Sequence, residues 1–268
     1  MIKFSDLCFG SKQNIKYLKE LLESLLHIHI TSLEVRNDVS LDKIHADNKH
    51  MRLDLLAEID GKYKVNLEIQ NGNEYNVIDR SENYASYIRH DSLKSGDKHT
   101  NVQPLIVIWI LSYDLFQDGP YHEESLTIRA SNSEILSNHF KIHFFQMPKF
   151  IRDVREIKTP EEQWLAYLSS QLNDEELGEL FKMNRSIEEI NEIARIAMTD
   201  KDVRETMLAM ALQQDKENLI YAKGKEEGET NGENKKSLEI AKKMKDAGEP
   251  IEKIIDFTGL TKEEIEKL

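Results

Sequence analysis

Two acidic side chains on neighbouring segments are the residues of this sequence best suited to chemistry. Asp54 ends the run Arg52-Leu53-Asp54, and Glu68 lies within Asn66-Leu67-Glu68-Ile69-Gln70. Carboxylate oxygens bind hard divalent cations, and a cation held by two carboxylates can be presented to a phosphate group. We therefore expect a divalent-metal site formed by Asp54 and Glu68, with Gln70 as a polar partner.

These two segments are predicted to form a β-hairpin. Apolar and polar residues alternate from Val65 to Gln70, which places Glu68 and Gln70 on the same face of one strand. In the preceding segment Leu56 interrupts the polar face, which indicates partial burial on both sides. Asp60-Gly61 supplies the turn.

The length of the hairpin loop decides whether the two carboxylates can meet. A strict two-residue turn pairs Ile59 with Lys62 and puts Asp54 and Glu68 on opposite faces. A loop with one more residue pairs Ile59 with Tyr63 and puts Asp54 directly across from Glu68, with about 5 Å between their Cβ atoms. We predict the odd-residue loop, because only this register forms a metal site.

Length and composition indicate a compact domain with an appendage. The chain has 268 residues, enough for a sizeable core and a smaller second module. A single cysteine, Cys8, excludes an intramolecular disulfide, and no signal-peptide pattern is present. The longest apolar run, residues 105–111, is too short to cross a bilayer. We expect a soluble cytoplasmic protein with no membrane partner.

The charge distribution leaves nucleic acid open as a partner. The net charge is −13, which disfavours contact with phosphates. Residues 1–150 contain 17 basic and 21 acidic residues, whereas residues 151–268 contain 19 basic and 28 acidic residues. Most of the excess acid thus lies outside the hairpin segment. Because no basic stripe is present, we expect weak or metal-assisted DNA binding.

The order of predicted elements indicates an α/β fold with a mixed sheet flanked by helices. Besides the hairpin, helices are expected at residues 14–26 and 77–93, and strands at residues 32–37, 105–111, 124–129 and 141–147. The strand at 105–111 is apolar throughout, which is typical of a central strand buried on both faces.

The second half of the sequence is predicted to be helical. We expect the core at residues 1–150, a helical extension packing on it at 151–221, a charged linker or exposed helix at 222–236, and a small helical tail at 237–268. In the tail, Thr261 and Glu264 have the spacing of a capping box. The tail resembles a helix-turn-helix DNA reader, but the glutamates of its last helix favour self-association or protein contact.

Beyond these local patterns, an ordered set of motifs resembles the Rpn family of recombination-promoting nucleases and transposases, within the PD-(D/E)XK superfamily. Asp54 and Glu68-Ile69-Gln70 match the nuclease motif in its E-x-Q form. The likeness covers nearly the whole chain and includes these further segments: Phe9-Gly10, Asn14, Arg52-Leu53, Arg80-Ser81 with Tyr84, Pro104, His143-Phe144, Pro148-Lys149-Phe150 and Thr258-Gly259-Leu260.

The resemblance implies a restriction-endonuclease-like core and a DNA endonuclease that acts in recombination or on mobile elements. It implies Mg²⁺, with Mn²⁺ as an alternative, bound by Asp54, Glu68 and the carbonyl of Ile69. Gln70 occupies the place of a lysine in many relatives. A neutral amide can orient water or phosphate, but it supplies no positive charge and is not a base. No phosphate-binding loop for a nucleotide cofactor is found.

The helix after the hairpin offers candidate DNA contacts. Arg80, Tyr84 and Tyr87 share one helix face, and Arg80 and Tyr84, together with Arg52, are the expected phosphate contacts. Both tyrosines are more simply explained by packing on the sheet. For Arg80, a phosphate clamp and a surface ion pair are equally consistent with the sequence.

Further alternatives fit the same sequence. A catalytically inactive nuclease-like scaffold, binding DNA or protein through its tail, fits the same sequence, and cleavage of both strands would favour a homodimer. Glu20 and Glu23 could add a carboxylate, although exposed helical glutamates are common. His27 and His29, like His139 and His143, have metal-compatible spacings, but surface or core histidines are the more common explanation.

Overall fold

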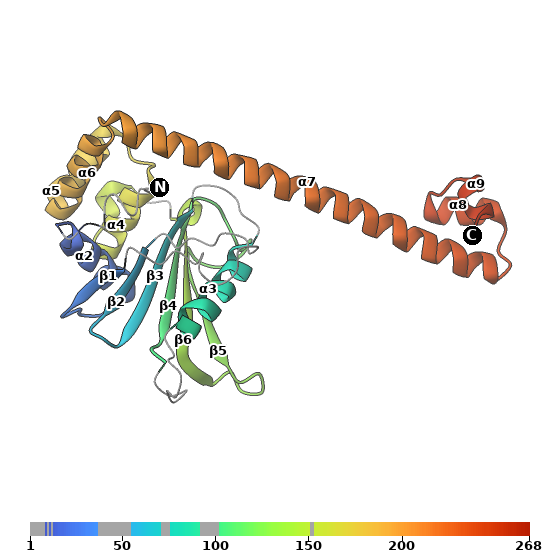
Figure 1. Cartoon of the computed structure of the whole chain (residues 1–268), viewed down its shortest axis with the longest axis horizontal. Helices are drawn as coiled ribbons and strands as arrows, with labels where there is room; N and C mark the ends of the chain where they lie inside the picture. Colours follow the sequence, from blue (N-terminus) through green and yellow to red (C-terminus); the bar gives the residue numbers. More distant parts are fainter. Residues whose placement is uncertain are drawn as a thin grey trace. The chain divides into compact units, whose positions relative to one another are not determined.

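The chain folds into a mixed sheet with helices on both faces, followed by a long helix and a small helical unit (Figure 1). The computed structural model describes residues 9, 11, 13–36, 55–70, 76–91, 102–150 and 153–268, apart from some side chains of the long helix. The strands are β1 (Leu33–Arg36), β2 (Leu55–Ile59), β3 (Tyr63–Gln70), β4 (Leu105–Leu111), β5 (His122–Ile128) and β6 (Ile135–Gln146). The helices that precede the long helix are α2 (Ile15–Leu26), α3 (Val77–Asp91), η3 (Met147–Lys149), η4 (Val154–Glu156), α4 (Pro160–Ser169), α5 (Asp174–Met183) and α6 (Arg185–Ala197).

The six strands lie in the order β1-β2-β3-β4-β6-β5. The first three form an antiparallel meander, β4 is parallel to both β3 and β6, and β5 returns antiparallel along β6. The predicted mixed α/β sheet is therefore confirmed. The apolar strand Leu105–Leu111 is central, as its uninterrupted hydrophobicity indicates.

The hairpin has the predicted odd-residue loop. Ile59 pairs with Tyr63 and Leu55 pairs with Leu67, so three residues separate the strands. Asp60 and Gly61 both adopt positive φ angles, 53° and 63°, which aspartate and glycine tolerate better than most residues. The register is thus the one that the sequence requires for a carboxylate pair.

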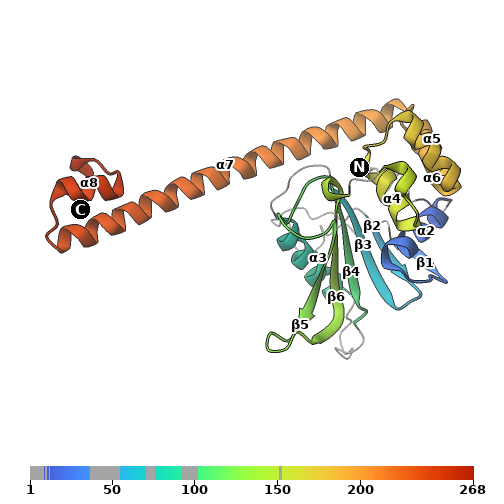
Figure 2. The same ribbon diagram turned by 180° about the vertical axis from the view of Figure 1, so that it is seen from behind.

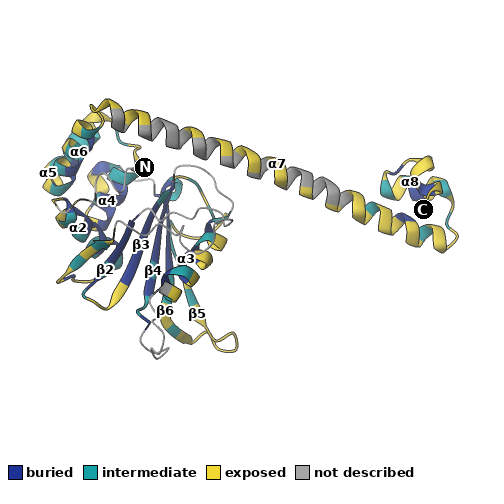
Figure 3. Cartoon of the chain, in the orientation of Figure 1, coloured by how far each residue is buried: buried dark blue, intermediate teal, exposed yellow. Residues whose placement is uncertain are grey.

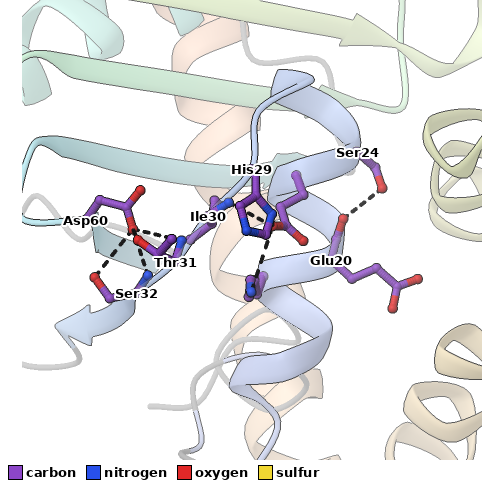
Figure 4. Close-up of polar contacts among 9 residues, drawn as sticks. Glu20, Ser24, His29, Ile30, Thr31, Ser32 and Asp60 are labelled. Carbon is purple, nitrogen blue, oxygen red and sulfur yellow. Dashed lines mark hydrogen bonds and ion pairs between the residues drawn. The ribbon is translucent and has the colours of Figure 1, made fainter.

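Asp60 also fastens this turn to the chain that enters β1. Its Oδ1 accepts hydrogen bonds from the backbone N–H groups of Thr31 and Ser32, at 2.9 and 2.7 Å, and from the Thr31 hydroxyl at 2.6 Å (Figure 4). The side-chain hydrogen bond from Thr31 is the main reason that the pKa of Asp60 falls to about 2. The turn of the β2–β3 hairpin is therefore tied to the neighbouring strand by an ionised carboxylate.

The two faces of the sheet bury separate hydrophobic clusters, because side chains alternate along each strand. On one face Leu67, Ile108 and Phe145 pack with the helices α2 and α4. On the other face Trp109 and Phe144 pack with α3, which lies in front of the sheet in Figure 1 and behind it in Figure 2. The strands β3 and β4 are accordingly buried along most of their length (Figure 3).

The C-terminal unit, residues 209–268, has a small core of its own. It contains the end of α7 (Lys201–Asp246), followed by α8 (Ile251–Thr258) and α9 (Lys262–Glu266), around the buried residues Ala241, Ile254, Leu260 and Ile265. Thr261 and Glu264 form the predicted capping box. Residues 222–236 are helical and belong to α7.

The predicted elements agree with the observed ones within a few residues, except that β6 begins at Ile135 rather than near residue 141. Its first half is largely exposed, so the hydrophobic signal there is weak. The boundaries at residues 150, 221 and 236 remain predictions. Among the described residues, no helix is both long and apolar enough to cross a membrane.

We expect Asp60→Asn to lower the free energy of unfolding, because the ionised carboxylate accepts several hydrogen bonds. Since folding lowers this pKa from 3.8 to about 2, the contribution of the charge is complete above about pH 4 and is lost as the pH falls towards 2. Urea unfolding at several pH values measures the difference. Asp114→Asn, at an exposed aspartate after β4, is the control, and a wild-type advantage that did not shrink in acid would contradict the assignment.

Candidate active site

Glu68 lies in the middle of the sheet, on the face covered by α3. Its partner across the parallel ladder is Trp109, which belongs to the hydrophobic cluster that packs against α3 (the α3-side cluster). The side chain of Glu68 is almost fully buried, with 1% exposure, and Asn66 and Gln70 on the same face are also buried. Such a carboxylate is costly to bury unless positive or polar groups stabilise it.

Arg80 of α3 approaches these buried polar side chains. Its Nη2 lies 3.4 Å from Glu68 Oε2, and its Nη1 donates a hydrogen bond of 3.3 Å to Gln70 Oε1. Asn66 Nδ2 donates to the other oxygen of Glu68 at 3.1 Å. The guanidinium thus faces Glu68 and Gln70, the two polar residues of the motif, a contact that the spacing of residues along the sequence does not reveal.

An aromatic platform holds Arg80 in place. The guanidinium carbon lies 5.0 Å from the centre of the Trp109 ring and 5.6 Å from that of Tyr84, and the Tyr84 hydroxyl accepts a 3.0 Å hydrogen bond from Arg80 Nη2. Both distances are within the range of a cation–π interaction. The two rings stack with 6.5 Å between their centroids. Tyr84 is therefore a packing residue in this structure, with 3% exposure.

A buried hydrogen bond fixes α3 on the sheet beneath this platform. Trp109 Nε1 donates to Ser81 Oγ at 2.7 Å, and Ser81 Oγ donates to the Val77 carbonyl at 2.8 Å. Ser81 is fully buried. Adjacent residues of α3 therefore have different roles: Ser81 anchors the helix on the sheet, and Arg80 faces the Glu68 carboxylate.

The remaining candidate residues divide into three groups. Arg52 and Asp54 lie outside the described residues. Ile69 lies in β3 beside Ile110, and Tyr87 is partly buried against the α3-side cluster. Glu20 accepts a hydrogen bond from Asn184, and Glu23 accepts one from the Ile30 N–H, so both have structural partners.

The donor set around Glu68 fits a hard divalent cation. A carboxylate and two side-chain amides offer oxygen atoms on one face of β3, and oxygen is the ligand type that Mg²⁺ prefers. Asn66 Oδ1 is buried and, within the described structure, has no hydrogen-bond partner. A buried amide oxygen of this kind can serve as a ligand, directly or through water.

Comparison with known proteins identifies the family. A family model described as "PD-(D/E)XK nuclease family transposase" matches residues 4–223, which is most of the chain. The chain belongs to this family. Comparisons with the curated proteins and with the solved structures give no match. This family is a nuclease family related to mobile elements. The mixed sheet flanked by helices is consistent with a restriction-endonuclease-like fold.

A second polar cluster lies on the opposite face of the sheet, towards α2 and α4. His143 of β6 and His122 of β5 approach within 3.0 Å, and Glu124 of β5 lies beside them. Burial lowers the pKa of His143 to about 4 and also lowers that of His122, so both imidazoles are neutral near pH 7. The spacing of His139 and His143 in the sequence does not predict this cluster, because the partners of His143 come from the neighbouring strand β5.

Ser81→Ala should destabilise the protein by about 1–3 kcal/mol, because the indole N–H of Trp109 would be left buried without an acceptor. Ser86→Ala is a matched control on the same helix: its hydroxyl also donates to the carbonyl four residues back, but it is exposed. Adding Trp109→Phe to Ser81→Ala should cost less than the sum of the two single changes. Additive losses in urea unfolding would contradict a specific Ser81–Trp109 bond.

Proposed function

We propose that this protein is a divalent-metal-dependent DNA endonuclease whose active site is centred on Glu68. The observation that carries this proposal is a buried carboxylate in the family's E-x-Q motif, flanked by an amide on each side and approached by an arginine. Membership of a nuclease family related to mobile elements supports phosphodiester cleavage as the activity and DNA as the substrate.

Asp54 is the proposed second carboxylate. The hairpin pairs Leu55 with Leu67, and the same register continued by one residue matches Asp54 with Glu68. Directly opposite residues of an antiparallel pair have Cβ atoms about 5 Å apart, which suits two ligands of one ion. Asp54, Glu68 and the Ile69 carbonyl would hold Mg²⁺ or Mn²⁺ there. When bound, such an ion acts as a Lewis acid that activates water and neutralises charge on the phosphate.

Arg80 supplies the positive charge that Gln70 lacks. Its guanidinium lies 3.3 Å from Gln70 Oε1, so a cation faces the motif position where many relatives have a lysine. The aromatic platform of Tyr84 and Trp109 positions the guanidinium. In this arrangement Arg80 stabilises negative charge on a non-bridging phosphate oxygen, and the Gln70 amide orients water or phosphate. Arg52 is a further proposed phosphate contact.

Removal of either carboxylate should strongly reduce cleavage. Glu68→Gln keeps the shape of the side chain, and we expect this change and Asp54→Ala each to reduce Mg²⁺-dependent plasmid cleavage by about a hundredfold or more, since even groups that only support metal ligands contribute 10–100-fold. Glu58→Gln, on the same hairpin but paired with Arg36, is the control and should cleave like the wild type.

The outcome of this assay also tests the alternative of an inactive scaffold. Cleavage that survived Asp54→Ala and Glu68→Gln would refute the proposed site. A wild type that cuts nothing with Mg²⁺ or Mn²⁺ but still retards DNA in a gel would favour a binding protein.

The role of Arg80 can be tested by relocating its charge. We expect Arg80→Gln to lower kcat by about 10²–10³-fold, the usual cost of losing a group that stabilises transition-state charge. Gln70→Lys alone should not increase activity, because it places two cations together. In the Arg80→Gln background, however, Gln70→Lys should restore part of the lost activity. Failure of this rescue in two well-folded variants would argue that Arg80 acts only in packing.

A further inference from the structure

The cluster on the α2 and α4 face of the sheet consists of His122, Glu124 and His143. Glu124 pairs with His143 across the β5–β6 ladder, and His122 lies two residues before Glu124, so all three side chains share one face. His122 Nε2 lies 3.0 Å from His143 Nδ1, and Glu124 Oε1 lies 3.4 Å from the same nitrogen. One nitrogen or oxygen of each residue lies within 4.8 Å of the others.

The two separations measured from His143 Nδ1 match those between the ligands of one transition-metal ion. Zinc binds imidazole nitrogen and carboxylate oxygen at about 2.0–2.2 Å, so two ligand atoms at a tetrahedral angle are about 3.3 Å apart. The observed 3.0 and 3.4 Å bracket that value. Two histidines and one glutamate are also a ligand set found in zinc sites that keep one position open.

Hydrogen bonding alone satisfies this cluster poorly. A proton on His143 Nδ1 could be donated well to His122 or to Glu124, but not to both. When His143 Nδ1 binds an ion, the ring proton lies on Nε2, which is buried and has no hydrogen-bond partner within the described structure.

Additional negative charge lies nearby. Tyr121, the residue before His122, donates from its hydroxyl to Glu161 Oε1 at 3.1 Å, and Glu161 also pairs with His27 at 2.8 Å. Glu161 is 7% exposed, and its charge acts on His122. A cation bound by the cluster would therefore be stabilised by Glu161 as well as by Glu124.

We propose that His122, Glu124 and His143 bind one divalent transition-metal ion, preferentially Zn²⁺, that joins the edge strand β5 to β6. This site is separate from the proposed nuclease site. His143 pairs with Ile108, whose side chain faces α2 and α4, whereas Glu68 faces α3. The ligand types also differ, because imidazole nitrogen favours Zn²⁺ and its neighbours in the transition series over Mg²⁺.

The test uses the full chain, stripped with a chelator and then kept in excess Mg²⁺ to occupy oxygen-ligand sites. Addition of Co²⁺ should give the visible absorption of a low-symmetry nitrogen and oxygen site, with one ion bound per chain and displacement by Zn²⁺. His122→Ala and Glu124→Gln should each weaken Zn²⁺ binding by at least about a hundredfold, since they remove ligands rather than their supports. His139→Ala, an exposed histidine of the same strand β6, should bind like the wild type.

Glu68→Gln distinguishes the two sites. This variant should keep the Co²⁺ spectrum and the Zn²⁺ affinity even if it cleaves no DNA. The proposal is overturned if the wild type binds no Co²⁺ or Zn²⁺ under these conditions, or if His122→Ala and Glu124→Gln bind as tightly as the wild type. Loss of binding in Glu68→Gln alone would also overturn it, because the ion would then occupy the nuclease site.

Discussion

The register of the β2–β3 hairpin is the constraint on which the candidate active site depends. Ile59 pairs with Tyr63 because Asp60 and Gly61 adopt left-handed conformations and the loop holds three residues. A shift of one residue would turn every side chain of β2 to the other face of the sheet. The ionised Asp60 carboxylate therefore does more than stabilise a turn, since its bonds to the chain before β1 hold the geometry that decides which residues face Glu68.

A buried negative charge is the second organising feature. Glu68 is held by Asn66 on its own strand and by Arg80 on α3, and the guanidinium in turn lies over the stacked rings of Tyr84 and Trp109. The Ser81–Trp109 hydrogen bond fixes the helix that carries the arginine. The polar site and the hydrophobic core on this face thus share the same residues, so packing and electrostatics there cannot vary independently.

Much of the fold could be predicted because the signals are local. The alternation in β3, the apolar run of β4 and the amphipathic pattern of α2 each specify an element from consecutive residues. The loop length was predictable because only one register brings the carboxylates together. By contrast, two clusters depend on which helices and strands lie side by side. One is the contact of Arg80 with Glu68 and Gln70, and the other is the contact of His143 with His122 and Glu124. Spacing along one segment carries no information about such neighbours.

The order of the strands has a consequence for how the site forms. The meander β1-β2-β3 is built from contacts between consecutive strands, whereas β4 reaches β3 only after the chain has passed through α3. Local contacts form with a smaller loss of chain entropy than distant ones. In a chain in which α3 and β4 were not docked, Glu68 would be a solvated carboxylate on an uncovered strand, so its dehydration depends on these non-local contacts. The full desolvation cost of this carboxylate is thus met only when Arg80 arrives on the same helix that excludes the water.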